Sequence, residues 1–307
     1  MDNKFCWVLT GPTASGKTAL SIRLAKAYDC EIVCMDSMQI YRRMNIGTAK
    51  PTADEMSGIP HHMLDVADPD ENFSVARYQE MAEACIADIH SRGKRALLVG
   101  GTGLYLRALR QPMAMGDVSG DEGIRAELEA WAKEEDGKQR LHDMLAQVDP
   151  DTAGRLHLND VRRAVRALEV YRLTGVPFSK QPQIQTDSRF KYRVASLTME
   201  RSLLYSRIEK RVDMMIAQGL VDEVRALLNS GIPADCQGMK AIGYKEIVPY
   251  IRGEATWEET DYLLKLNTRH YAKRQLTWMR REDDVLWVDS TASDAYETLE
   301  KWFTRGE

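Results

Sequence analysis

The chain has 307 residues, of which 44% are hydrophobic and 29% are charged, and its formal net charge is −4. This composition is typical of a soluble globular protein with one large domain or two smaller ones. It contains no run of about 18 apolar residues, which excludes a membrane-spanning helix, and its net charge excludes a globally basic nucleic-acid-binding protein. The five cysteines form no CxxC pair, and the first residues lack a signal-peptide pattern. We therefore expect reduced thiols and a cytoplasmic location, with no membrane partner.

The first 110 residues alternate between strand-like and helix-like segments. Short apolar runs predict strands over residues 4–10, 31–37, 61–66 and 95–101. Helical spacing predicts helices over 17–28, 74–93 and from 102 to 110, with Ser74 as the N-cap of the second. This alternation predicts an α/β fold in which helices flank a parallel sheet. Ligands of such sheets bind at the carboxyl ends of the strands.

Residues 113–189 depart from this alternation because no segment within them has a strand pattern. Helices are predicted over 123–148 and 158–175, and a loop over 176–190. The sheet pattern resumes with a strand at 193–199, long helices at 201–231 and 256–281, a strand at 285–290 and a final helix. We therefore predict a catalytic core formed by residues 1–112 and 190–307, interrupted by an all-helical insertion at 113–189.

The segment GPTASGKT matches the phosphate-binding pattern GxxxxGK[ST] and lies between a predicted strand and a predicted helix. Its glycines allow backbone N–H groups to surround phosphate oxygens, and Lys17 adds a positive charge. Thr18 offers a hydroxyl ligand to Mg²⁺. The predicted diphosphate-binding residues of this P-loop are Gly11, Pro12, Thr13, Ala14, Ser15, Gly16, Lys17 and Thr18.

P-loop NTPases often carry a magnesium-binding aspartate at the end of a later strand. The corresponding predicted strand here, over 95–101, ends in Gly100 and Gly101 and has no acidic residue. The strand over 31–37 instead delivers Asp36, 19 residues after Lys17. We expect Asp36 to act on a second substrate beside the phosphates. Two alternatives stay open at this point, a turn-forming aspartate and a small-molecule kinase that uses the carboxylate to activate a hydroxyl.

Several further segments occur in a characteristic order: DSMQIYRRMNIGTAKP, LLVGGTGLYLRAL, AIGYKEI and TRHYAKRQLTWMRR. Together with the P-loop, they resemble the bacterial tRNA dimethylallyltransferases over nearly the whole chain. The resemblance implies a P-loop NTPase-like core whose loop holds the diphosphate of dimethylallyl diphosphate. It also implies transfer of the dimethylallyl group to the exocyclic amine of the adenosine 3′ to the tRNA anticodon (position 37), with Mg²⁺ as cofactor. The insertion would then clamp the anticodon stem-loop.

The resemblance also assigns roles to residues near the P-loop. Asp36 corresponds to the general base and Thr102 to a threonine that contacts the tRNA near the reacting base, although Thr102 could instead be a helix N-cap. Ser37, Met38 and Gln39 would border the bound tRNA together with Asp36. No DDxxD motif offers another diphosphate site.

Clusters of arginine and lysine are the remaining candidates. By resemblance, the insertion contacts tRNA through Arg125, Arg162 and Arg163. Arg166 is a further candidate because it shares a helical face with Arg162; a solvated helix face is the alternative for these arginines. The segment 268–281 carries Arg269, Lys273, Arg274, Arg280 and Arg281 without an acidic residue, which favours an RNA surface with Lys273 and Arg274 as contacts. Trp278 and Leu276 in the same segment could equally be core residues. Arg207 and Arg211 lie one helical turn apart, and we expect at least one to reach the diphosphate; a surface arginine ladder is the alternative.

Three other functions are compatible with parts of the pattern. A small-molecule kinase would explain the P-loop but neither the insertion nor the basic segment. A prenyltransferase acting on free AMP would not need the insertion, and an RNA-binding module without catalysis would not need Asp36. Because nothing in the sequence indicates an obligate dimer, we expect a monomer.

Overall fold

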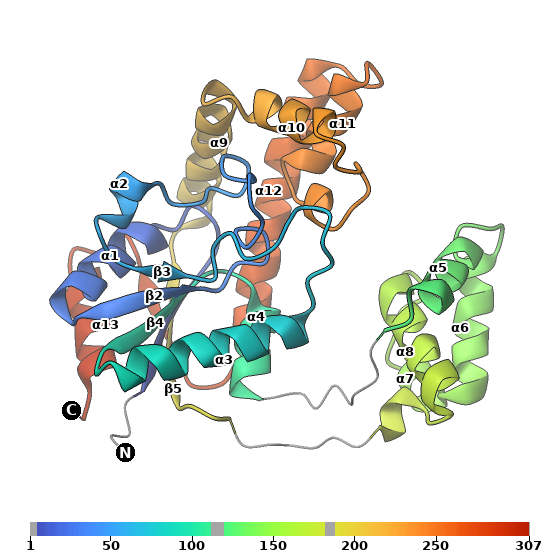
Figure 1. Cartoon of the computed structure of the whole chain (residues 1–307), viewed down its shortest axis with the longest axis horizontal. Helices are drawn as coiled ribbons and strands as arrows, with labels where there is room; N and C mark the ends of the chain where they lie inside the picture. The colour runs from blue at the N-terminus through green and yellow to red at the C-terminus, as the bar shows by residue number, and fades with distance from the viewer. Residues whose placement is uncertain (1–4, 112–119, 182–187, 307) are drawn as a thin grey trace. The chain divides into compact units, whose positions relative to one another are not determined.

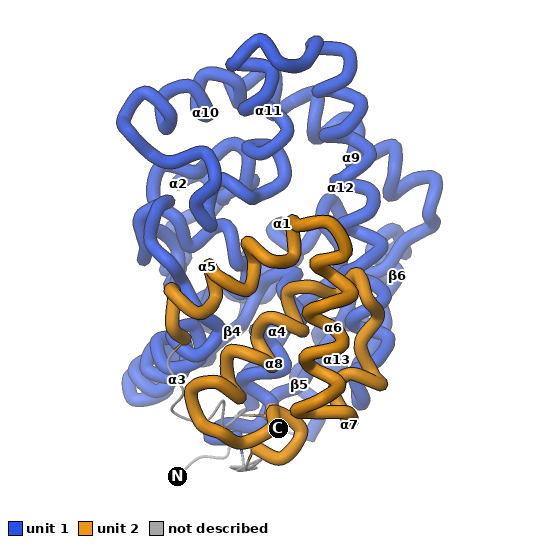
Figure 2. The backbone as a smooth tube through the Cα atoms, turned by 90° about the vertical axis from the view of Figure 1, so that its right-hand side faces the viewer, with its two compact units in different colours: residues 1–110, 188–307 blue, residues 111–187 orange. Residues whose placement is uncertain are grey.

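The computed structural model describes residues 5–111, 120–181 and 188–306. It divides into two compact units, which Figure 2 distinguishes by colour. Unit 1 consists of Met1–Arg110 and Ser188–Glu307, and unit 2 of Gln111–Asp187. The boundaries predicted from the sequence fall two residues later in the chain, and the one at Met113 lies outside the described residues.

Unit 1 is built on a sheet of six parallel strands in the order β3-β2-β4-β1-β5-β6 (Figure 1). Its strands are β1 (Cys6–Thr10), β2 (Cys30–Cys34), β3 (His61–His62), β4 (Arg95–Val99), β5 (Tyr192–Thr198) and β6 (Val285–Asp289). The predicted α/β fold with a parallel sheet is therefore confirmed. The strand predicted over 61–66 is reduced to the two residues of β3, at the edge of the sheet.

Helices cover both faces of this sheet. They are α1 (Lys17–Ala27), α2 (Ala53–Met56), α3 (Val75–Ser91), α4 (Gly103–Arg110), α9 (Arg201–Ala217), α10 (Leu220–Asn229), α11 (Tyr244–Ile251), α12 (Trp257–Met279), α13 (Ala295–Thr304) and the 3₁₀ turn η2 (Gly238–Lys240). Ser74 caps α3 as predicted, since its hydroxyl accepts a hydrogen bond from the Arg77 N–H. The prediction of one helix over 201–231 is wrong, because Gly219 adopts a left-handed φ of 97° and separates α9 from α10. No helix within the described ranges is long and apolar enough to cross a membrane.

Alternate residues of β1 supply two hydrophobic cores, one on each face of the sheet. Trp7 and Leu9 pack in the core formed with α1 and α13. Cys6 and Val8 belong to the larger core on the opposite face, which includes residues of α3, α4, α10, α11 and α12. Because both faces are buried, the strands read as continuous apolar runs rather than as alternating patterns.

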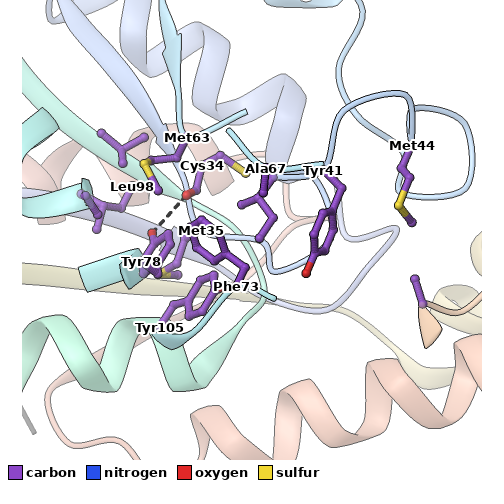
Figure 3. Close-up of a cluster of buried hydrophobic side chains, with 14 of the residues drawn as sticks. Cys34, Met35, Tyr41, Met44, Met63, Ala67, Phe73, Tyr78, Leu98 and Tyr105 are labelled. Atoms are coloured by element: carbon purple, nitrogen blue, oxygen red, sulfur yellow. Dashed lines mark hydrogen bonds between the residues drawn. The ribbon is translucent and has the colours of Figure 1, made fainter. Parts of the chain in front are cut away.

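The larger core supports the carboxyl end of β2, as Figure 3 shows. The rings of Tyr78 and Tyr105 stack with their centroids 3.7 Å apart. The Tyr78 hydroxyl donates a 3.0 Å hydrogen bond to the carbonyl of Cys34, the last residue of β2. Two helices, α3 and α4, thereby fix the point from which the chain leaves the sheet toward Asp36.

The described residues of unit 2 form helices joined by turns, with no strand among them. It contains α5 (Glu122–Trp131), α6 (Gly137–Val148), α7 (Pro150–Ala153), α8 (Val161–Thr174) and the 3₁₀ turn η1 (Phe178–Lys180). The prediction of a continuous helix over 123–148 is wrong, since the chain turns between α5 and α6 with a left-handed φ of 56° at Asp136. The connection between the predicted helices 123–148 and 158–175 contains α7, whose first turn is capped by the Asp149 carboxylate. Buried leucines and alanines of α5, α6 and α8 form a core within this unit.

Candidate active site

The P-loop connects the carboxyl end of β1 to the first residue of α1. Gly16 precedes the helix with a left-handed φ of 91°, which directs the backbone N–H groups of the loop and of the first helical turn toward one concave site. The Lys17 ammonium donates to the carbonyls of Gly11 and Pro12 at 2.9 and 2.7 Å. The Ser15 hydroxyl is buried and has no hydrogen-bond partner in the described chain. The loop thus offers donors suited to a phosphate anion.

Arg211 of α9 extends this positive region. Its guanidinium donates a 3.3 Å hydrogen bond to the hydroxyl of Thr13 in the P-loop. Burial and the repulsion of Arg211 lower the pKa of Lys17 to about 7, whereas the negative charge of Asp36 opposes this shift. Two cations and one carboxylate are therefore close enough to interact. Arg207, which lies one helical turn from Arg211, is exposed, and within the described residues no hydrogen bond or ion pair joins it to the P-loop.

Asp36 follows β2 at the same edge of the sheet. Its Oδ1 accepts hydrogen bonds from the N–H groups of Met38 at 2.9 Å and Gln39 at 3.4 Å. The turn-forming interpretation is thus correct for this oxygen. Oδ2 has no hydrogen-bond partner among the described residues, and the side chain is half-buried. One carboxylate oxygen therefore fixes the orientation of Asp36, while the other can accept a proton from a substrate.

Thr102 follows β4 and lies beside this turn. Its hydroxyl accepts a 3.0 Å hydrogen bond from the Ser37 N–H, and its N–H donates to the carbonyl of Met35 at 3.2 Å. The Thr102 carbonyl accepts hydrogen bonds from the first turn of α4, so the backbone of Thr102 begins that helix while its side chain contacts the segment after β2. The ends of β1, β2 and β4 together carry the P-loop, Asp36 and Thr102.

The segment 36–50 is ordered by its own polar side chains. The Gln39 amide donates to the carbonyls of Thr48 and Ala49, each at 3.1 Å, and its oxygen accepts from the Cys34 thiol. The Gln39 side chain, which the sequence suggested for RNA contact, is therefore engaged within the protein. The ammonium of Lys50, whose side chain is 5% exposed, contacts three acceptors: the Tyr41 carbonyl, Asn45 and Asp65.

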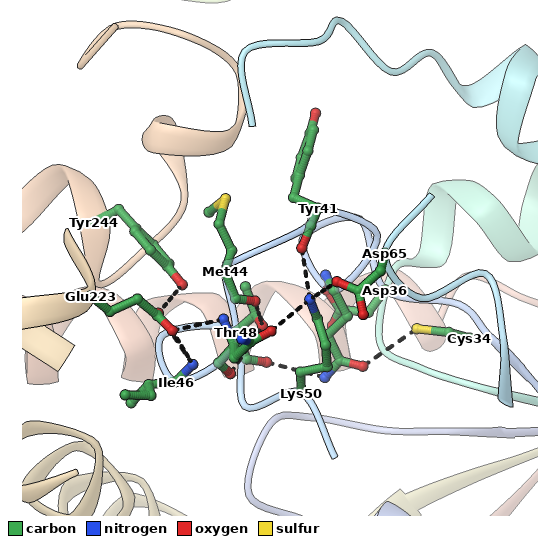
Figure 4. Close-up of polar contacts among 12 residues, drawn as sticks. Cys34, Asp36, Tyr41, Met44, Ile46, Thr48, Lys50, Asp65, Glu223 and Tyr244 are labelled. Carbon is green, nitrogen blue, oxygen red and sulfur yellow. Dashed lines mark hydrogen bonds and ion pairs between the residues drawn. The ribbon is translucent and has the colours of Figure 1, made fainter. Parts of the chain in front are cut away.

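A carboxylate from α10 holds the far end of this segment (Figure 4). Glu223 accepts hydrogen bonds from three successive backbone N–H groups at 2.9–3.2 Å, those of Asn45, Ile46 and Gly47. The Tyr244 hydroxyl donates a further hydrogen bond to Glu223 at 2.6 Å. Reasoning from the sequence missed Glu223, because no local motif indicates that a helix residue 178 positions away binds this segment.

The donors of the P-loop fit a magnesium–diphosphate complex. Thr18 is exposed at the start of α1, where its hydroxyl could supply one oxygen ligand. The described residues contain no group of three or more His, Cys, Asp or Glu side chains arranged to hold a metal. The Thr18 hydroxyl is the type of single oxygen ligand that a Mg²⁺ bound mainly to substrate phosphates and water could use.

The arginines predicted in unit 2 fall into two groups. Arg125 and Arg166 both pair with the fully buried Glu169 carboxylate, at 2.9 and 2.8 Å. Arg162 and Arg163 are exposed at the start of α8, and Arg163 pairs with Asp160 at 2.9 Å. The first pair thus has a structural partner within unit 2, whereas the second is presented to solvent.

Of the arginines and lysines in the segment 268–281, one forms an ion pair within the protein and the others are exposed. Arg269 pairs with Glu209 of α9, whereas Lys273, Arg274 and Arg280 are exposed. Trp278 and Leu276 are half-buried against hydrophobic clusters, which favours the core interpretation of both. Arg281, the last basic residue of the segment 268–281, lies in the turn after α12 and is exposed.

Comparisons with known proteins identify the family to which this chain belongs. Residues 39–282 match the family model described as IPP transferase. The chain is 49% identical to a tRNA dimethylallyltransferase of Halalkalibacterium halodurans over 93% of this chain and 91% of the relative. It is 52% identical to a tRNA dimethylallyltransferase of Desulforudis audaxviator, over 92% and 91% of the two chains.

Solved structures give the same result. The fold is similar to a full-length tRNA isopentenylpyrophosphate transferase from Bacillus halodurans, with a TM-score of 0.73 and 46% identity, covering 98% of this chain and 94% of that one. A eukaryotic dimethylallyltransferase acting on tRNA gives a TM-score of 0.76 at 30% identity, covering 99% of this chain and 76% of that one. The chain therefore belongs to the IPP transferase family, whose curated members matched here are tRNA dimethylallyltransferases.

Proposed function

We propose that the protein transfers the dimethylallyl group of dimethylallyl diphosphate to the exocyclic amine of the adenosine at tRNA position 37 and releases diphosphate. The observation that carries this proposal is the placement of Asp36 and Thr102 at strand ends beside the P-loop. This arrangement offers an anion site for a leaving group and a carboxylate for a nucleophile at the same sheet edge. Family membership supports the choice of prenyl donor and tRNA acceptor.

In the proposed reaction, the bond between the prenyl carbon and the diphosphate oxygen breaks while a carbon–nitrogen bond forms to adenine. Negative charge develops on the departing diphosphate. Lys17, Arg211 and free backbone N–H groups of the P-loop would stabilise that charge as it develops. Thr18 would hold Mg²⁺ at this site, and the ion would supply further charge neutralisation.

The attacking amine loses a proton as it becomes alkylated. Oδ2 of Asp36 accepts that proton, while the hydrogen bonds to Oδ1 keep the carboxylate oriented. The adenine must leave its stack in the anticodon loop to reach this position, which costs a few kcal/mol. Thr102 and the segment 36–39 border the unstacked base, with Lys273 and Arg274 contacting the RNA backbone.

Unit 2 is proposed to hold the anticodon stem-loop through Arg162 and Arg163. Both side chains are exposed, and the ion pair between Arg163 and Asp160 is also at the surface, where a phosphate can compete with the carboxylate. Arg125 and Arg166, which Glu169 already binds, would contribute by shaping unit 2 and by adding positive charge near its surface. We further propose that the enzyme acts as a monomer in the cytoplasm, where its RNA substrate would be found.

Parallel incubations with different candidate substrates test this function. The protein is incubated with Mg²⁺ and radiolabelled dimethylallyl diphosphate in the presence of tRNA, AMP or no acceptor, and in parallel with labelled ATP. We expect label in tRNA at the adenosine of position 37. Transfer to AMP alone would identify a mononucleotide prenyltransferase, and transfer of phosphate from ATP would identify a kinase.

A further inference from the structure

A buried amide on α12 bridges the P-loop and the loop after β4, which contains Thr102. Gln275 is 6% exposed. Its Oε1 accepts the Thr13 N–H at 2.9 Å, and its Nε2 donates to the Gly101 carbonyl at 3.1 Å. One rigid side chain thus fixes the separation between the loop after β1 and the loop after β4.

The Gln275 amide packs directly against Gly101, in the loop after β4. A Cβ atom built on Gly101 would lie 1.9 Å from Nε2 of Gln275, so a side chain at position 101 would displace the amide from this position. Burial raises the pKa of Tyr271, one helical turn earlier on α12, and the nearby polar side chains of Thr102 and Gln275 oppose this shift. The same face of α12 therefore contacts the P-loop and Gly101 and lies near Thr102.

The amide group is chemically specific for this bridge. It must accept from one backbone N–H and donate to one backbone carbonyl, which neither a carboxylate nor an ammonium can do. Because Gln275 occupies the Thr13 N–H, that donor serves the architecture of the loop rather than the phosphate. Movement of the P-loop on binding an anion would be transmitted through the amide to Gly101 and the adjacent Thr102.

We infer that Gln275 is a positioning residue that couples the diphosphate site to the site of the acceptor base. This inference rests on the proposed function and assigns Gln275 a role without contact to either substrate. Occupation of the P-loop then favours one position of Thr102 and of the Ser37 N–H bound to it. Binding of diphosphate and of RNA should consequently strengthen each other reciprocally.

Binding measurements on the full chain test this coupling. The dissociation constant of an anticodon stem-loop RNA is measured with and without saturating magnesium pyrophosphate. For the unmodified protein we expect pyrophosphate to tighten RNA binding about fivefold or more. In Gln275→Met, which keeps the length of the side chain but removes both hydrogen bonds, the two RNA affinities should agree within about twofold.

Two further variants separate positioning from charge and from general stability. Gln275→Glu keeps an acceptor for Thr13 but places an oxygen against the Gly101 carbonyl, so it should also lose the coupling. Gln237→Met is a matched control, since Gln237 likewise bridges a backbone N–H and a carbonyl, both of Phe73. It should reduce the melting temperature to a similar extent while retaining the coupling.

Turnover completes the test. Both Gln275 variants should lower kcat about 10–100-fold, because misplacing a reacting group by about 1 Å has effects of this size, with the KM of either substrate changed much less. A wild-type protein that prenylates RNA while the Gln275 variants retain kcat and coupling would overturn the inference alone. Absence of coupling in an active wild-type protein would also overturn it. A wild-type protein that does not prenylate RNA would overturn the proposed function and this inference together.

Discussion

The hydroxyl of Thr102 accepts a hydrogen bond from the backbone N–H of Ser37 over 3.0 Å. This contact joins the chain after β4 to the chain after β2, next to Asp36. The candidate base is thereby positioned from both sides, by its own turn and by a neighbouring strand end. Residues that are distant in the sequence thus lie next to each other at one edge of the sheet, as the proposed catalysis requires.

Asp36→Asn should abolish most of the transfer without weakening RNA binding. The amide keeps an oxygen that can accept the Met38 N–H, so the turn persists, but it cannot take a proton from the amine. We expect kcat to fall about 10²–10⁴-fold, with the RNA dissociation constant changed less than about threefold. Single-turnover kinetics and an RNA-binding titration measure the two effects. Undiminished turnover would remove Asp36 from the role of base.

The two arginines on α9 form a matched pair for mutation. Arg211→Gln removes a charge that contacts the P-loop, so the KM for dimethylallyl diphosphate should rise about 10–100-fold. Arg207→Gln removes an exposed charge one turn away and should change that KM less than about threefold. Steady-state kinetics with varied donor at saturating RNA distinguish them. Equal effects would show that the contact with Thr13 is irrelevant to donor binding.

Charge reversal at Arg162 and Arg163 should weaken RNA binding in a salt-dependent way. Both side chains are exposed. The slope of log affinity against log salt should become shallower by about 0.9 or somewhat less for each phosphate that is no longer neutralised. The comparison variant is Arg125→Gln, which removes a partner of the buried Glu169. Arg125→Gln should lower the melting temperature, whereas the double reversal should leave it nearly unchanged. An unaltered salt slope in the double variant would contradict a role for α8 in RNA binding.

Replacement of Glu223 should loosen the segment 36–50. In Glu223→Gln, one acceptor oxygen facing the backbone N–H groups of Asn45, Ile46 and Gly47 becomes a donor. A loss of about 1–3 kcal/mol of unfolding free energy is expected, together with lower kcat because the segment begins at Asp36. Tyr244→Phe removes only one of these hydrogen bonds and should have a smaller effect on both quantities. Denaturant unfolding and kinetics on the two variants provide the check; a larger effect of Tyr244→Phe would refute the assigned role of Glu223.

Acid stability should depend on Glu31, a buried residue at the start of β2. Its side chain is 4% exposed and pairs with Arg92, His62 and Lys94. The hydrogen bond from Arg92 is the main cause that lowers the pKa of Glu31 to about 2. The contribution to stability is therefore present above the unfolded-state pKa of about 4.3 and is lost as the pH falls toward 2. Glu31→Gln should be less stable by about 2 kcal/mol at pH 7, and the difference should shrink below pH 4. A difference independent of pH would exclude this linkage.

The sequence predicts the sheet well because its signals are local. The P-loop matches a pattern whose strand and helix context is contiguous, and Asp36 ends an apolar run that parallel pairing places at the same edge. Helix breaks were predicted less well: Gly219 and Asp136 each take a left-handed φ within apparently continuous helical patterns. The side chains that position the site were not predictable from local patterns. Gln275 and Glu223 act on backbone groups 262 and 178 residues away.

In the proposed reaction, the P-loop holds diphosphate, a leaving group that departs from carbon. The most direct measurement uses dimethylallyl diphosphate with ¹⁸O in the bridging position and follows the label by mass spectrometry after reaction with tRNA. We predict that all ¹⁸O appears in the released diphosphate and that the tRNA gains only the dimethylallyl group. Label retained on the prenyl product, or a phosphorylated RNA, would show cleavage at phosphorus and would contradict this claim.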